Sequence, residues 1–119
     1  MTLSAKRAGP ILLVAFAGEV TQRDLEGWLQ GIDLPGQDDL TTVVASLRDT
    51  RSLDSEGIRC LVLLRDHVEQ NEKAFHVTEL PPNIRYTLQV ADLLDFLHYM
   101  PELTPVLEGH SLTRSDFAS

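Results

Sequence analysis

The residues best placed to do chemistry are four consecutive ones, Asp54, Ser55, Glu56 and Gly57. They stand between a polar segment and a long stretch whose apolar residues recur at helical spacing. An Asp or Ser at such a point caps a helix by accepting a hydrogen bond from a first-turn N–H, which is worth about 1 kcal/mol. Acidic residues there also suit the helix dipole. The segment therefore predicts a capped helix that begins with a serine hydroxyl.

Motifs for catalysis are otherwise missing from the chain. It has no glycine-rich dinucleotide loop, no P-loop and no HExxH zinc motif. A hydrolase with Ser55 as nucleophile would need the GxSxG elbow, but Leu53 stands where its first glycine belongs. A nucleotide site at the start of this helix is opposed by Asp54 and Glu56. We therefore expect a protein that is not an enzyme and takes no cofactor.

The histidines are scattered along the chain, at His67, His76, His98 and His110. None stands four residues from another on an expected helix, which is the spacing of helical metal ligands. We expect satisfied or exposed imidazoles and no metal site.

Composition describes one compact domain of 119 residues, 43% hydrophobic and 24% charged. Folding at this length buries roughly two-thirds of the unfolded surface, enough for stability without disulfides. The net charge of −8 has the wrong sign for binding nucleic acid. No segment approaches the ~20 apolar residues that span a bilayer, so we expect no membrane insertion. The single cysteine, Cys60, favours a reducing, cytoplasmic setting.

The start of the chain allows two interpretations. Lys6 and Arg7 precede the apolar run 11–17, which resembles the layout of a signal peptide. The run is at the short limit for such a peptide, Pro10 opens it, and the cleavage site would fall inside it. We therefore favour a native strand over 11–17.

Hydrophobic periodicity predicts strands alternating with helices. The expected elements are strands over 3–7 and 11–17, a helix from Thr21 to about 35, a strand over 41–47, a polar connection over 48–52, a helix from Asp54 or Ser55 to about Gln70, a strand over 74–80, a short helix after Pro81 and Pro82, a strand over 96–100 and a helix over 101–107. This order indicates an α/β fold with a mixed sheet of about five short strands, an opening hairpin and crossover helices.

The arrangement resembles the STAS domain, the module of sulfate transporters and anti-sigma factor antagonists. The best part runs from Val43 to Leu64, where strand, loop, DSxG and apolar helix follow in the family's order; GEV at 18–20 and LPPNIRYTLQVADLLDF at 80–96 add to it. The resemblance covers about residues 3–107. We expect a STAS-like domain over 1–107 and a flexible tail over 108–119.

The resemblance implies a regulatory role. In anti-sigma factor antagonists the serine of DSxG is the phosphorylation site, which falls on Ser55, with Asp54 as its acidic neighbour. The unphosphorylated protein would bind an anti-sigma factor that is also a serine kinase, and a metal-dependent serine phosphatase would reverse the modification. The residues expected to contact the partner are Thr21, Asp54, Ser55, Glu56, Gly57, Arg59 and Leu63. Whether the chain is a monomer or a homodimer stays open.

The chain departs from the family pattern at four positions. An acidic residue is common where Thr21 stands and in the central strand where Ser46 stands. The residue after the serine is often small, but here it is Glu56. A glycine common near the end of the short helix after Pro82 is replaced by Asp92.

Leu63 is the second candidate for partner binding. At about 100° per residue, Ile58, Leu61, Leu64 and Val68 face the sheet, whereas Leu63 lies about 200° from Leu61. With Cys60 and His67 beside it, Leu63 is expected to form an apolar spot on the outer face. The alternative is an ordinary exposed leucine.

The main rival function within the same fold is a constitutive interaction domain. Such a domain would serve a transporter, a lipid-transport complex or a stress-sensing scaffold without phosphorylation of Ser55.

Overall fold

The computed structural model describes residues 2–19, 27 and 39–109. Five strands and three helices lie in these ranges. They are β1 (Thr2–Ala8), β2 (Ile11–Glu19), β3 (Thr42–Ser52), α2 (Ser55–Gln70), β4 (Ala74–Thr78), α3 (Pro82–Val90), β5 (Tyr99–Met100) and α4 (Thr104–Gly109). The expected helix from Thr21 to about 35 lies outside the described residues except for Gly27, which is helical. The expected tail over 108–119 begins too early, because residues 108 and 109 belong to α4, and its remainder, 110–119, lies outside the described residues.

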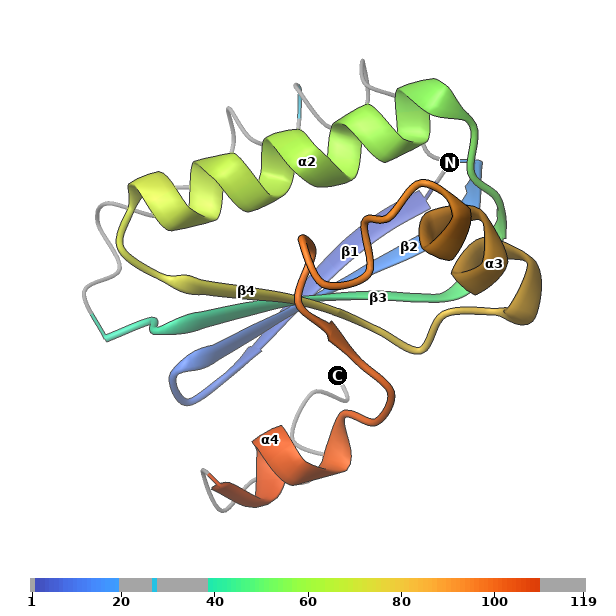
Figure 1. The fold of residues 1–119 in the computed structure, drawn as a ribbon. Coiled ribbons are helices and arrows are strands. Elements are labelled where there is room, and N and C mark those ends of the chain that lie inside the picture. Colours follow the sequence, from blue (N-terminus) through green and yellow to red (C-terminus); the bar gives the residue numbers. More distant parts are fainter. Residues whose placement is uncertain (1, 20–26, 28–38, 110–119) are drawn as a thin grey trace.

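The sheet is mixed, as the sequence predicts. Its strand order is β1-β2-β3-β4-β5; β1 pairs antiparallel with β2, and all the other pairs are parallel. Parallel neighbours need a crossover over one face of the sheet. Helix α2 makes that crossover from β3 to β4, and α3 lies on the path from β4 to β5 (Figure 1).

The two faces of the sheet are buried by different helices. Along β2, Leu12, Val14 and Phe16 join the large core beneath α2 and α3, whereas the alternating Ile11 and Leu13 pack in a smaller cluster. That smaller cluster includes Leu103 and Leu107, so α4 covers the face opposite α2 (Figure 1). Burial on both sides explains why the run 11–17 is apolar throughout. The strand interpretation of this run is confirmed.

The expected polar connection over 48–52 is wrong, because these residues continue β3. After a register shift, Ala17 pairs with Asp49 and Glu19 with Ser52. The buried Thr50 hydroxyl donates to the Phe16 carbonyl at 3.1 Å. Pairing with its parallel neighbour β2 thus extends β3 beyond the point where the apolar pattern stops.

Strand β5 is shorter than expected, and helix α4 begins later than expected. Strand β5 holds Tyr99–Met100 rather than 96–100, because the preceding turn places His98 at a φ of 54°. Helix α4 begins at Thr104 rather than at Pro101. Pro105 then occupies the first turn, where no backbone N–H is needed.

Helix α3 ends in a Schellman motif whose left-handed residue is Asp92. Its N–H donates to the Gln89 carbonyl at 3.0 Å, and the Leu93 N–H donates to the Leu88 carbonyl at 2.9 Å. Asp92 has a φ of 57°, the conformation that glycine adopts without a steric cost. The backbone geometry therefore explains why a glycine suits this position.

We expect Asp92→Gly to stabilise the protein by about 1 kcal/mol, since it removes the cost of a left-handed side-chain residue. The free energy of unfolding from urea titration measures this. The matched control is Gln89→Gly, inside α3, which should lower the stability by about 0.5–1 kcal/mol. If both glycines destabilised the protein equally, the left-handed conformation at Asp92 would be disproved.

Candidate functional site

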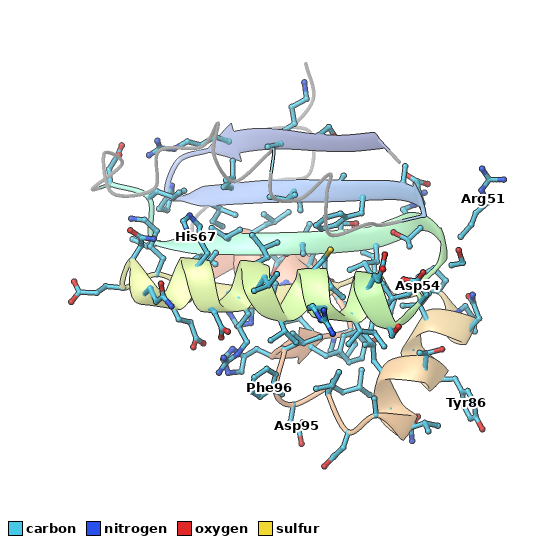
Figure 2. All side chains as sticks on the ribbon, turned by 90° about the horizontal axis from the view of Figure 1, so that it is seen from above. Arg51, Asp54, His67, Tyr86, Asp95 and Phe96 are labelled. Atoms are coloured by element: carbon cyan, nitrogen blue, oxygen red, sulfur yellow. The ribbon has the colours of Figure 1, made fainter. Side chains whose placement is uncertain are left out.

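The candidate site is built where β3 ends and α2 begins. Asp54 is the N-cap of α2 in extended conformation, and its Oδ1 accepts a hydrogen bond from the Gly57 N–H at 2.8 Å. The Asp54 carbonyl accepts from the Ile58 N–H at 2.9 Å, the first bond of the helix. The expected start at Asp54 or Ser55 is confirmed. Figure 2 shows Asp54 at this end of the helix.

Ser55 is the first residue of α2, and its side chain is exposed. The cap is made by Asp54, so the Ser55 hydroxyl is not needed to hold the helix together. Within the described residues the structure records no hydrogen bond of that hydroxyl. Ser55 is therefore an exposed residue whose hydroxyl takes no part in the capping bond.

The neighbouring residues of the expected partner-binding set divide by exposure. Glu56 and Arg59 are exposed, whereas Gly57 is buried. Thr21 lies outside the described residues. Ser55, Arg59 and Leu63 follow one another at four-residue spacing, so they form a single line along the helix, with about 6 Å between successive residues.

Leu63 is the last residue of that line, and its side chain is only partly exposed. It is half-buried and packs against the large core. The expected position of Cys60 beside it on the outer face is wrong, because Cys60 is fully buried in the core. Cys60 is four residues from Leu64, a rotation of only about 40°, and so shares the buried stripe of α2. His67 is half-buried and its Nε2 is enclosed without a hydrogen-bond partner in the described part of the chain.

A contact that the sequence did not reveal joins α3 to this end of the sheet. The Asn83 side-chain amide donates to the Arg51 carbonyl at 3.2 Å. The Arg51 side chain itself is exposed and points away from α2 in Figure 2. The bond fixes the first turn of α3 next to the strand end from which α2 starts. The hydrophobic pattern of the sequence does not predict this contact between α3 and the end of β3.

Ser46, in the central strand, contacts a carboxylate on the face of the sheet opposite α2. Ser46 alternates with the core residues Ala45 and Leu47, so its side chain lies on the face opposite α2. Its hydroxyl donates to Oε1 of Glu79 at 2.9 Å. The carboxylate of Glu79 thus lies against β3, but it does not join the group around Ser55.

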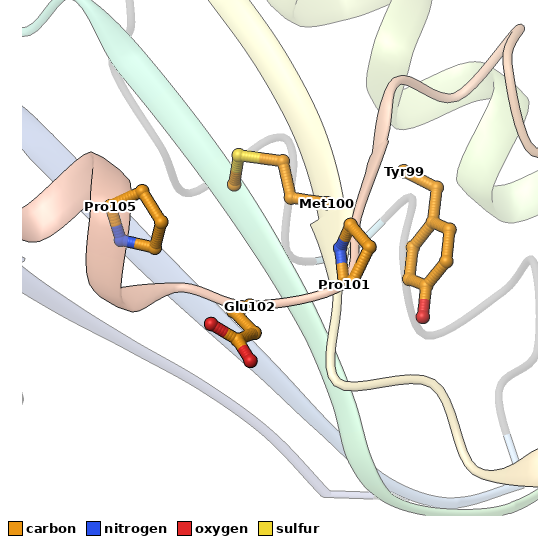
Figure 3. A pocket seen from close by; sticks show the side chains of 5 residues that line it. All are labelled: Tyr99, Met100, Pro101, Glu102 and Pro105. Carbon is orange, nitrogen blue, oxygen red and sulfur yellow. The ribbon is translucent and has the colours of Figure 1, made fainter.

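A separate pocket of about 380 Å³ lies between β5 and α4. Its lining is largely apolar and consists of Tyr99, Met100, Pro101, Glu102 and Pro105 (Figure 3). None of the candidate site residues lines it. The pocket and the Ser55 group are therefore two different places on the molecule.

The Asp54 cap gives a direct stability prediction. Asp54→Ala should lower the free energy of unfolding by about 1 kcal/mol, because the Gly57 N–H loses its acceptor. Asp54→Asn keeps an acceptor oxygen and should retain most of that stability. Urea titration of the two variants measures the difference. Equal losses would assign the effect to the Asp54 charge rather than to the cap.

Comparisons with known proteins agree on the fold. No protein-family model matches the chain, and no curated protein matches it in sequence. Among solved structures, the anti-sigma factor antagonist SpoIIAA in its unphosphorylated form is similar with a TM-score of 0.71 and 14% identity, over 95% of this chain and 100% of that one. SpoIIAA has also been solved in the phosphorylated form, as a Bacillus cell fate determinant, with a TM-score of 0.64 and 15% identity over 88% of this chain and 96% of that one.

Two further solved structures have a similar fold. An anti-sigma factor antagonist from Mycobacterium paratuberculosis has a TM-score of 0.70 and 18% identity, over 91% of this chain and 92% of that one. The murine anion transporter Slc26a9 matches with a TM-score of 0.66 and 14% identity, over 89% of this chain but 18% of the transporter. The chain therefore has the STAS fold of the anti-sigma factor antagonists, over nearly its whole length. No helix in the described ranges is both long and apolar enough to cross a membrane.

Proposed function

We propose that this chain is an anti-sigma factor antagonist-like module that phosphorylation of Ser55 switches off. Its partner is an anti-sigma factor with serine kinase activity, bound over the N-terminal end of α2, and a serine phosphatase restores binding. The module is a regulator of transcription in the bacterial cytoplasm and has no catalysis of its own. The observation that carries the proposal is the exposed Ser55 hydroxyl beside a cap made by Asp54.

Electrostatics supplies the switching mechanism. A phosphoryl group adds roughly −1.5 to −2 charges to Ser55, between Asp54 and Glu56. The isolated domain tolerates this charge, because the unpaired N–H groups at a helix start favour an anion. A docked partner must instead bury it against these carboxylates and any acid of its own. Two like unit charges 4 Å apart repel by about 4 kcal/mol at an effective dielectric of 20.

That repulsion is large enough without a change of fold. A loss of about 3 kcal/mol already weakens binding more than a hundredfold. The similarity of this chain to SpoIIAA in both its unphosphorylated and phosphorylated forms supports a switch that leaves the fold intact. Arg59, one turn beyond Ser55, offers an exposed cation for the partner's acids or for the phosphate.

Intact-mass measurement tests the modification. Incubation with the cognate kinase and ATP should add about 80 Da, one phosphate, to the wild-type chain. The Ser55→Ala protein should gain nothing under the same conditions. A Ser55→Ala chain that gained the same mass would place the phosphate elsewhere and refute the assignment.

The alternative is a constitutive STAS interaction domain without phosphorylation. The similarity to a segment of the Slc26a9 transporter favours it, since in that protein the fold is part of a much longer chain. Under this alternative, Ser55 is only a surface residue at the helix start. Replacing it by Asp would then leave partner binding unchanged, which separates the two functions.

A further inference from the structure

The pocket between β5 and α4 is lined by none of the residues assigned to the Ser55 group (Figure 3). Its volume of about 380 Å³ is at the lower end of the range of small-molecule sites, about 300–1,000 Å³. Its lining combines apolar and aromatic side chains with a single carboxylate, that of Glu102. We propose that this pocket binds a small organic cation, a molecule with an apolar body and one protonated amine.

The two side chains that β5 contributes to the pocket are held in place by the rest of the fold. Tyr99 packs against the large core, and Met100 packs against the smaller cluster on the opposite face of the sheet. The Tyr99 N–H donates to the Leu94 carbonyl at 2.9 Å, and the Met100 carbonyl accepts from the Thr78 hydroxyl at 2.9 Å. This side of the pocket is therefore preformed, which lowers the entropy cost of binding a ligand.

The segment that joins β5 to α4 forms the rest of the lining. The rings of Pro101 and Pro105 fix the backbone φ at both positions. Leu103, between these prolines in the sequence, is buried in the smaller cluster and so anchors the segment on the sheet. The two proline rings therefore give the pocket a stiff apolar wall.

The Glu102 carboxylate determines which charge the pocket prefers. Seen as in Figure 3, it lies between the rings of Pro101 and Pro105. Within the described ranges the structure shows no hydrogen bond or ion pair of this carboxylate. The aromatic ring of Tyr99 also attracts a cation, and the net charge of −8 adds a field of the same sign. A protonated amine therefore complements the pocket, whereas an anionic ligand is repelled.

The compact lining favours a small molecule over a peptide. All the lining residues fall within 99–105, one short segment of the chain. An extended peptide is recognised instead by a groove or a sheet edge that contacts several of its side chains in turn. We therefore assign the pocket to a small molecule.

Three probes of matched shape test the proposal on the tag-free chain. Phenylpropylamine, phenylpropanol and phenylpropionate share one aromatic ring and differ in charge at neutral pH. In titrations followed by amide NMR, the signals of Tyr99, Met100 and Glu102 should shift first. We expect the amine to bind about two- to fivefold more tightly than the alcohol, the strength of an exposed ion pair. The carboxylate should bind more weakly than both.

Glu102→Gln removes the charge and keeps the size of the side chain. In this variant the amine should bind no more tightly than the alcohol, while the affinity for the alcohol stays that of the wild type. The matched control is Glu108→Gln, which removes an exposed charge of α4 that does not line the pocket and should retain the preference for the amine.

Three results would overturn the proposal. They are equal affinity of the wild type for the amine and the alcohol, a preference for the amine that survives Glu102→Gln, and amide shifts confined to residues outside 99–105. None of these results depends on the phosphorylation of Ser55.

Discussion

Replacing Ser55 by Asp should weaken binding of the partner kinase more than a hundredfold. The substitution places a permanent negative charge next to Asp54 and Glu56, and a partner that docks there must bury it. At about 4 Å from another carboxylate this charge costs about 4 kcal/mol at an effective dielectric of 20, which exceeds the ~3 kcal/mol needed for the predicted loss. A pull-down followed by affinity measurement on the recovered partner gives the value.

Ser55→Asn is the matched control for this experiment. Asn has the size and shape of Asp but no charge, so it should bind the partner much more tightly than Ser55→Asp. The Ser55→Ala protein should also bind the partner. If Asp and Asn reduced binding equally, the effect would be steric, and the electrostatic mechanism would be wrong.

Leu61→Ala should have the largest effect on stability, a loss of about 2–5 kcal/mol in the free energy of unfolding. Leu61 is fully buried between α2 and the sheet, so truncation removes buried methyl groups and leaves a cavity in the large core. Urea unfolding measures the loss. A value below about 1 kcal/mol would show that α2 does not pack on the sheet as described.

Leu63→Asp separates packing from docking on the same helix. Leu63 is half-buried at the edge of the core, so its substitution should cost much less stability than a charge at Leu61. If Leu63 also contacts the partner, binding falls by more than this moderate loss of stability can explain. A loss of stability as large as that of Leu61→Ala would instead assign Leu63 to the core.

Much of the fold could be predicted because local signals agreed with the tertiary structure. The DSEG segment indicated the start of α2, since a capping carboxylate and a helical apolar stripe are both local properties. The extension of β3 over 48–52 was missed, because these mostly polar residues are held by pairing with β2, a contact that periodicity does not encode. The prediction that Cys60 lies near the surface was wrong because the buried face of α2 is wide. It includes Gly57 and Cys60 beside Leu61, Leu64 and Val68.

The candidate site was predictable in part. Asp54, Ser55, Glu56 and Gly57 are contiguous, so the cap brings them together without tertiary information. The Asn83 contact with Arg51 depends on how distant segments meet. Such contacts between distant segments can be recognised only once the sheet is assembled.

The phosphorylation switch is most directly tested by comparing the Ser55 phosphate in the free and the partner-bound protein. The protein is purified from the cells that produce it, and its free and partner-bound fractions are separated by size-exclusion chromatography. Mass spectrometry then gives the phosphate occupancy of the peptide containing Ser55 in each fraction. We expect the Ser55 phosphate in the free fraction and its absence from the bound fraction. Equal phosphate occupancy in both fractions would contradict the switch.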